Sequence, residues 1–285
     1  MDNKQKTHRW KIWVGILAAL VLLILGGLYF VSYKLGSMLD KKLKEGITKS
    51  SEGLYSIEYS DLDLNIVGGN LTLKDILLKN DSTAYIKLDS AKKAPNIRFE
   101  ARADRLAISG ASVWGLLVNK KIDIGTIALD SLKAKVLLRD RPYNEKEEKA
   151  SYAKVKDRFK SWGVDKFRGN GIALELADLN MEGTKPKKVK GVDIAVYNFL
   201  IDEHSGTDST RFLYSKDISL HIPGFKTNLE GAPYTFSFKD LKFSSKNRDV
   251  QISKLSLQPT LSLEAFAKQD KLNKPRIELD LDSTW

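Results

Sequence analysis

Apolar and polar positions alternate along most of the chain in one recurring unit, apolar-x-apolar-x-x-apolar-x-apolar. An alternation of period two predicts a β-strand with one apolar face. The three-residue step in the middle of the unit would turn that face over, so we expect a bulge or a kink at each step. The pattern therefore predicts a long sheet that is apolar on one side and bends at regular places. The apolar positions of the unit are Ile57, Tyr59, Leu62 and Leu64; Leu71, Leu73, Ile76 and Leu78; Ile122, Ile124, Ile127 and Leu129; Leu174, Leu176, Leu179 and Met181; Phe236, Phe238, Leu241 and Phe243; and Val250, Ile252, Leu255 and Leu257.

One long apolar run, residues 12–33, lies outside this pattern and contains no charged residue. At a rise of about 1.5 Å per residue it would be about 33 Å long, which is enough for the hydrocarbon core of a bilayer. Trp10 and Trp13 at one end, and Tyr29 and Tyr33 at the other, lie where aromatic belts are found. A signal peptide usually has a shorter apolar region, followed by a small-x-small cleavage site. We therefore expect a transmembrane anchor that is not cleaved.

The charges beside this anchor do not orient it by themselves. Basic residues exceed acidic ones by the same margin in residues 1–11 and in residues 34–49, so the positive-inside rule does not decide. A short basic tail is hard to translocate, whereas a large domain that follows an anchor can be exported. We therefore expect residues 1–11 to be a cytoplasmic tail and the main domain to lie across the membrane.

The chain after the anchor begins with a helical section and a first β unit. Residues 34–50 carry apolar side chains at helical spacing and predict a helical extension of the anchor. Residues 51–140 predict strands and turns, with turn signals at Gly68-Gly69-Asn70 and Asn80-Asp81-Ser82.

Residues 141–163 change the period and predict an amphipathic helix. Apolar positions recur at helical spacing from Tyr152 to Trp162, with acidic residues early and basic residues late, as the helix dipole favours. Such a helix could cap the sheet, lie on the membrane surface or rest in a groove, and packing against the sheet is the default. Gly169-Asn170-Gly171 then ends this helical section.

Residues 164–285 predict a second β unit, in which strands resume at Ile172. No closing helix or polar cap follows the last strand, so we expect either a partner at this end or a protein that continues beyond it. The fold class is therefore mainly β: a transmembrane helix followed by an elongated, bent β-sheet groove with one or two amphipathic helices. The expected strands are Val192–Ile201, Ile218–Ile222, Tyr234–Phe243, Val250–Leu257, Leu261–Leu263 and Ile277–Leu281.

Composition adds little to this picture. The net charge is +11, but lysines and arginines mostly alternate with apolar residues along strands, as at Lys133, Lys135 and Arg139. The simplest interpretation is a solvated strand face; attraction to anionic lipid headgroups is a second. No recognition helix or aromatic RNA-binding motif is present, so we expect no nucleic-acid partner. The chain has no cysteine, which excludes disulfides and thiolate metal sites.

The residues that carry enzyme chemistry do not cluster in the sequence. The histidines, His8, His204 and His221, have no second histidine or paired carboxylate at ligand spacing. Gly68-Gly69 precedes no helix, so it is not a phosphate loop, and the nucleophile elbow Gly-x-Ser-x-Gly is absent. We therefore expect no catalytic residue, metal or cofactor, and the chain is not predicted to be an enzyme.

Residues 1–140 as a whole carry a family resemblance. A basic tail, an anchor and a helical extension are followed by the segments Gly53–Leu64 and Gly69–Ile76, which have the form Gly-x-Tyr-x-Ile-x-Tyr-x-x-Leu-x-Leu and Gly-Asn-Leu-x-Leu-x-x-Ile. Leu106–Gly110 and Ile122–Leu129 are similar to the next unit of the same family. The chain resembles the start of the AsmA-like family, which includes TamB-type lipid transfer proteins of Gram-negative envelopes.

The resemblance implies a single-pass inner-membrane protein, with the main domain in the periplasm, whose β-groove carries phospholipid between the inner and outer membranes. An anchored scaffold or assembly factor for outer-membrane proteins is the alternative, with outer-membrane or periplasmic partners at the C-terminal edge. The pattern alone does not separate an open groove from a closed sandwich in which the same side chains pack on one another. The residues expected to line the groove are Ile57, Tyr59, Leu71, Leu73, Ile122, Ile124, Leu174, Leu176, Phe236, Phe238, Val250 and Ile252.

Overall fold

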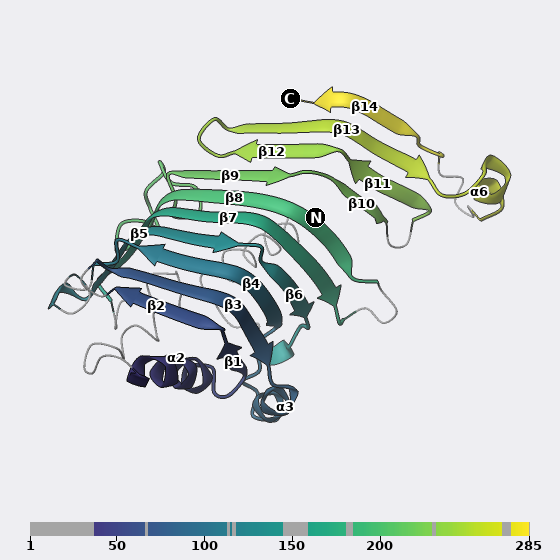
Figure 1. The fold of residues 1–285 in the computed structure, drawn as a ribbon. Helices are drawn as coiled ribbons and strands as arrows, with labels where there is room; N and C mark the ends of the chain where they lie inside the picture. The colour runs from purple at the N-terminus through teal and green to yellow at the C-terminus, as the bar shows by residue number, and fades with distance from the viewer. Residues whose placement is uncertain are drawn as a thin grey trace.

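The described part of the chain forms one large mixed sheet with short helices at its margins (Figure 1). The expectation of a mainly β chain is confirmed at this level. Residues 1–36, which include the expected anchor at 12–33, lie outside the described residues. Among the described residues, no helix is both long enough and apolar enough to span a bilayer. The computed structural model describes residues 37–65, 68–112, 115, 118–144, 159–180, 185–229, 232–269 and 275–284.

Fourteen strands make up the sheet, and most neighbours are antiparallel. The order is β1-β3-β4-β5-β7-β8-β9-β12-β13-β11-β10, with β2 beside β3, β6 between β4 and β7, and β14 beside β13. β5 and β6 both run parallel to β7. The strands are β1 (Tyr55–Glu58), β2 (Asp61–Asn65), β3 (Asn70–Asn80), β4 (Ile97–Ser109), β5 (Lys121–Asp130), β6 (Lys133–Leu138), β7 (Ser161–Asp178), β8 (Lys187–Ile201), β9 (Asp217–Ile222), β10 (Phe225–Asn228), β11 (Tyr234–Phe238), β12 (Asp240–Ser244), β13 (Asp249–Pro259) and β14 (Leu279–Thr284).

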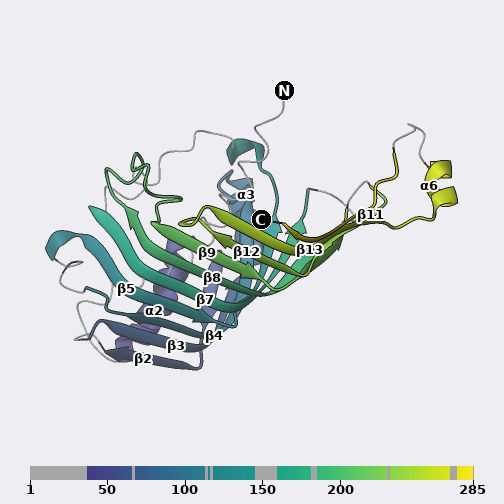
Figure 2. The same cartoon turned by 90° about the horizontal axis from the view of Figure 1, so that it is seen from above.

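Breaks between strands and irregular residues within strands lie on one line that crosses the sheet from edge to edge. The strand register places its members opposite one another, and the breaks between β1 and β2, β5 and β6, β9 and β10, and β11 and β12 all fall on it. We call it the bend line, and Figure 2 shows the sheet folded along it into a trough. The bend line consists of Ser60, Asp75, Asp104, Ser131, Gly171, Gly191, Gly224, Lys239 and Lys254.

The backbone on the bend line has the conformation that a three-residue step requires. Asp75 (φ 47°) and Lys254 (φ 49°) are left-handed, and each stands in the middle of one recurring unit. The ladder between β3 and β4 passes from Lys74↔Arg105 to Ile76↔Ala103 and omits the pair between them. The left-handed residue lets the apolar side chains before and after it face the same way. The expected kinks are therefore confirmed in β3 and β13.

The apolar face lies on the inside of the bend. Lys74 and Asp75 are both exposed at the bend line, whereas Leu73 and Ile76 on either side of them are buried. Buried residues from both sides of the bend line belong to one hydrophobic core, for example Leu78 on one side and Ile127 on the other. The trough is thus filled by its own side chains where β1 to β8 form it.

Two helices close the N-terminal end of this core. α2 (Ser37–Ser50) buries Leu43 and Ile47 in it, so the described part of the predicted section 34–50 is a helix, whereas its connection to the expected anchor lies outside the described residues. α3 (Ser82–Ser90) follows β3 and buries Tyr85. We had expected only a turn here. The Asp81 side chain accepts hydrogen bonds from the amides of Thr83 and Ala84, which makes it an N-cap that starts the helix.

Three other predicted segments were assigned to the wrong element or with the wrong end residues. Trp162 was expected at the end of a helix, but β7 begins at Ser161, and Trp162 pairs with Ile122 and Ile201. The segment Gly169–Gly171, expected to end that helix, lies within β7, because Gly171 (φ 61°) bends the strand at the bend line. Residues 145–158, which carry most of the predicted helix, lie outside the described residues.

The third of these segments lies near the C-terminus. The segment from Leu261 to Leu263 was expected as a strand, but it leads into the helix α6 (Leu263–Gln269). Phe266 is the residue of α6 that is buried, against the ring of Tyr234. Two leucines two residues apart fit either a strand or a helix. The packing of Phe266, four residues beyond Ser262, against Tyr234 favours the helix. A short 3-10 helix, η2 (Pro142–Asn144), follows β6, and the described residues 115, 118 and 119 are helical as well.

Candidate functional site

The strongest candidate for a functional surface is the inner apolar face of β9 to β14. Rows of apolar side chains cross these strands directly opposite one another: Leu220, Phe243 and Val250 form one row. Phe236, Leu257 and Leu279 form another beyond the bend line. The face continues without interruption from the closed core, because Leu220 pairs with Ile194 of β8.

This face differs from the core in its exposure. No apolar strand residue between Asp217 and Thr284 whose burial the structure describes is fully buried, and Val250 (45%), Leu279 (38%) and Leu281 (37%) are exposed to solvent. The packing that excludes water from β1 to β8 therefore ends near β8. What remains is an apolar surface that is continuous with a core but only half covered.

The predicted lining residues divide between these two environments. Five of them are packed in the core: Ile57 (8% exposed), Leu71 (3%), Leu73 (0%), Ile122 (3%) and Ile124 (2%). These five face other side chains of the same chain. The remaining seven are only partly covered or exposed. They are Tyr59, Leu174, Leu176, Phe236, Phe238, Val250 and Ile252.

Tyr59 marks the end that α2 closes. Its hydroxyl donates to the backbone carbonyl of Asp40 at 3.4 Å, and the Lys44 ammonium lies 4.7 Å from its ring centroid. Burial and the neighbouring Asp40 raise the pKa of Tyr59. Nearby, burial raises the pKa of Tyr55 to about 12, and its ring stacks on Phe99 with centroids 4.7 Å apart. These contacts tie α2, β1 and β4 into a closed end.

Three phenylalanines form an aromatic cluster at the opposite end of the face. Phe225 lies 5.7 Å from Phe238 and 6.4 Å from Phe236, centroid to centroid, and the last two are 6.2 Å apart. All three are only partly buried. Tyr234 extends the cluster toward α6, packing edge-on against Phe266 and accepting the backbone N–H of Ile277 at its hydroxyl oxygen. An aromatic surface of this kind suits apolar ligands without specifying one position.

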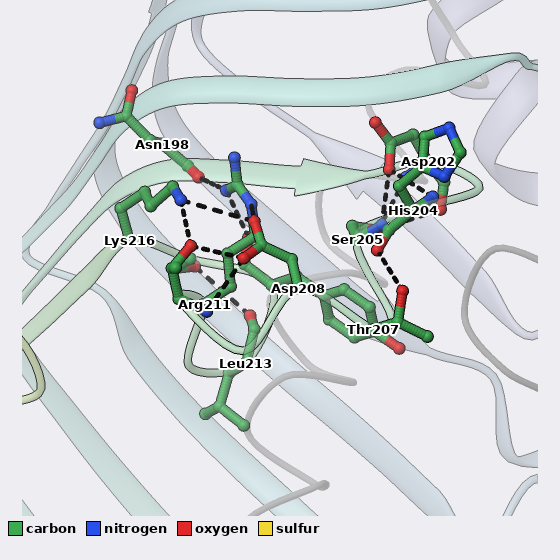
Figure 3. A network of polar contacts seen from close by, with 12 residues as sticks. Asn198, Asp202, His204, Ser205, Thr207, Asp208, Arg211, Leu213 and Lys216 are labelled. Atoms are coloured by element: carbon green, nitrogen blue, oxygen red, sulfur yellow. Dashed lines mark hydrogen bonds and ion pairs between the residues drawn. The ribbon is translucent and has the colours of Figure 1, made fainter.

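A polar loop of residues 202–216 borders the face where β8 meets β9 (Figure 3). The guanidinium of Arg211 donates to the Asp208 carboxylate at 3.1 Å and to the backbone carbonyls of Asn198 and Tyr214. Hydrogen bonds from Thr210, and the charge of Lys216, lower the pKa of Asp208 to about 2. This network holds the loop in one conformation.

The same loop presents a large apolar side chain at the border of the face. Phe212 is 48% exposed, and its ring centroid lies 6.1 Å from that of Phe243 in β12. Leu213 and Tyr214 follow it with positive φ angles, so the loop turns sharply after Phe212. The apolar row of Leu220 and Phe243 is thereby extended by one ring beyond the strands.

The outer face carries polar pairs that the sequence did not reveal. His221 has no paired carboxylate at ligand spacing in the sequence, but in the fold its Nε2 lies 2.7 Å from Asp240 and its Nδ1 lies 3.8 Å from Asp193. Both carboxylates come from neighbouring strands, so sequence spacing could not show them. Among the described residues no group of three or more histidine or carboxylate side chains is arranged so that it could hold a metal ion. The apolar inner face therefore remains the candidate site.

The sequence also missed several residues of this face. Leu220, Ile222, Phe225, Leu279 and Leu281 all contribute to it, although none belongs to the recurring eight-residue unit. Their signal was simple alternation over short segments, which the more elaborate pattern concealed. No protein-family model matches the chain, and no curated protein matches it either.

Proposed function

We propose that this chain is a membrane-anchored envelope protein that binds phospholipid acyl chains on the inner face of its bent sheet. The function would be phospholipid transport or lipid homeostasis between the inner and outer membranes. The observation that carries the proposal is the half-exposed apolar face of β9 to β14, which continues from a closed core. The apolar run at residues 12–33 supports an inner-membrane anchor, with the main domain in the periplasm.

The bent sheet supports the finer description as a folded-over β-groove. A trough with an apolar inside is the arrangement that the resemblance to the AsmA-like family implies for this chain. Each methylene of an acyl chain removed from water contributes about 0.8 kcal/mol, so a lipid tail on this face would be held strongly. Because an apolar surface has no directional bonds, the tail could still slide along it.

The structure limits where the lipid would bind. Leu73 and Ile124 lie in a packed core, so a lipid tail could reach them only by displacing their neighbours. Phe238 and Ile252 need no such displacement. We therefore assign lipid binding to the region from β9 onward, and we assign β1 to β8 the role of a folded base.

The proposal is tested by measuring lipid bound to the full chain. Protein purified in a mild detergent is analysed by native mass spectrometry and by lipid extraction. Phe238→Asp places a charge on the inner face, and Ser237→Asp places the same charge on the outer face of the same strand. We expect Phe238→Asp to lose most of the bound phospholipid and Ser237→Asp to keep it. Equal lipid in both variants would refute the proposal.

The scaffold alternative rests on one observation, the outer edge of β14. β14 pairs with β13 along Ile252–Leu257, and the described residues contain no strand on its other side. An unpaired edge can accept a strand from another protein. A photo-crosslinking residue at Asp280 or Asp282 that captures an outer-membrane protein in cells, with lipid binding absent, would favour this alternative.

A further inference from the structure

The sheet separates between β8 and β10 on one side of the bend line. β8 pairs with β9 from Asp193 to Tyr197, and this ladder ends at His221. Beyond it, β8 stays paired with β7 as far as Lys187, and β10 stays paired with β11. The described residues contain no ladder between β8 and β10. Figure 1 shows β10 and β11 leaving the direction of β8. We call the two facing edges, 187–191 and 225–228, the seam.

The sequence explains why the pairing stops. Pro223 follows β9 directly and has no N–H to donate to a neighbouring strand. Gly191 lies against it, so closely that a Cβ on Gly191 would be 2.9 Å from the Pro223 ring. Gly224 (φ 147°) then turns the chain away. The seam is therefore fixed at its apex by Gly191, Pro223 and Gly224.

Exposed lysines gather along the seam, and the alternation of β8 and β10 places Lys188, Lys190 and Lys226 on its outer side. Lys185, Lys188 and Lys190 are exposed within six residues at the start of β8, and Lys226 is exposed on β10. Lys188 forms an ion pair with Glu175 at 3.0 Å. Lysines on an unpaired edge also discourage aggregation, so their presence alone does not require a ligand. These lysines differ from those of an ordinary sheet edge because they lie beside the apolar face.

The inner side of the seam is apolar next to the bend line, at Val189 and Phe225, whereas Lys187, opposite Leu176, and Thr227, opposite Phe236, are polar positions of the same face. Val189 of β8 packs against the core, and Phe225 of β10 belongs to the aromatic cluster with Phe236 and Phe238. A molecule with an anionic head and apolar tails matches this order of groups from outside to inside. Within the lipid-binding function proposed above, we propose that the seam admits a phospholipid sideways and that Lys185, Lys190 and Lys226 bind an anionic headgroup.

The test compares an anionic with a zwitterionic lipid on the full chain. Delipidated protein in detergent is offered equal amounts of phosphatidylglycerol and phosphatidylcholine, re-isolated, and analysed for bound lipid. We expect wild type to bind phosphatidylglycerol with about a tenfold preference over phosphatidylcholine, because the lysine ammonium groups attract an anionic headgroup. The variant Lys185→Gln/Lys190→Gln/Lys226→Gln should lose that preference to within about twofold while its bound phosphatidylcholine is unchanged.

A matched control carries Lys121→Gln, Lys133→Gln and Lys135→Gln, three exposed lysines on strands that are paired on both sides. It should keep the preference of wild type. The inference is overturned if wild type shows no preference, if the seam variant keeps it, or if the control loses it equally. Phe238→Asp separates the two proposals. If Phe238→Asp binds as much of both lipids as wild type, lipid binding on the inner face is wrong. If only the seam proposal is wrong, wild type still binds lipid, and Phe238→Asp still loses it.

Discussion

The strands β1 to β8 and the strands β9 to β14 follow one pattern of alternation but differ in what covers their apolar face. In the first region Leu73 and Ile124 are almost completely buried, and α2 adds Leu43 and Ile47 to the same core. In the second region Val250 is 45% exposed, and the described helix, α6, contributes Phe266 at one end. The comparison teaches that alternation identifies an apolar face but not whether that face is closed.

The bend line, in contrast, is common to both regions. Asp75 and Lys254 take the same left-handed conformation at the same step of the pattern, one in each region. The bend is therefore built into the strands, whereas burial depends on what packs against them. The predictions that follow use this difference.

An introduced carboxylate should give the largest difference in unfolding free energy between the two regions. Ile124→Asp introduces an unpaired carboxylate into the core, and we expect it to lower the free energy of unfolding by more than about 4 kcal/mol. Phe238→Asp should cost about 1–2 kcal/mol, because water can reach the new carboxylate. Urea unfolding followed by circular dichroism measures both. Equal losses would mean that the two regions are packed alike.

Truncation of a leucine should give a smaller contrast in the same direction. Leu73→Ala leaves a cavity in the core and should cost about 2–5 kcal/mol. Leu257→Ala removes the same atoms from a half-covered face, and we expect a loss below about 1.5 kcal/mol because solvent fills the space. The midpoints of urea unfolding compare the two variants. A loss at Leu257 as large as that at Leu73 would contradict the assignment of an open face.

The bend line should respond alike in both regions. Valine is strained at positive φ, so Asp75→Val and Lys254→Val should each cost about 1–3 kcal/mol. Asp75→Val loses, in addition, the 2.7 Å hydrogen bond that the Ser60 hydroxyl donates to Asp75. Lys254→Gly is the control and should be neutral or stabilising, since glycine adopts this conformation freely. Tolerance of valine at either site would show that its left-handed conformation is dispensable.

The polar loop of residues 202–216 should show the smallest effect, and a pH dependence. The pKa of Asp208 is lowered to about 2, so its ionised form stabilises the folded loop at pH above about 4. This contribution is lost as the pH falls through about 2. Asp208→Asn should therefore speed hydrogen exchange of the Leu200 and Lys216 amides at pH 7, and wild type should approach the variant in acid. A difference between the two that persists unchanged in acid would exclude this carboxylate as the cause.

Much of the strand pattern could be predicted because its causes are local. Alternation located β9 and β13 within two residues and the end of β8, which begins five residues before the predicted strand, and the three-residue step located the kinks at Asp75 and Lys254. The misassigned segments are those where a local signal was ambiguous. Trp162 fitted a helix by spacing, and its partners in β5 and β8 decided for a strand. The segment Asn80-Asp81-Ser82 fits both a turn and the start of a helix, and the amide hydrogen bonds to Asp81 belong to the helix.

The candidate site was less predictable than the strands. Phe236, Phe238, Val250 and Ile252 occupy apolar positions of the same recurring unit as Leu73 and Ile124, yet they lie in a different environment. The carboxylates beside His221 come together only through pairing with neighbouring strands, and Lys226 lies far in sequence from Lys185 and Lys190. No spacing within one segment reports such neighbours.

The sequence by itself determined the strand type, the apolar face and the kinks in β3 and β13, because period, side-chain polarity and local backbone strain act within a few residues. The tertiary structure alone decided which stretch of that face is sealed and which is half open. Sealing requires the two sides of the bend line and α2 to meet across the trough, and residues far apart in the chain must contribute to it. The closed base of β1 to β8 and the open face of β9 to β14 are consequences of that packing.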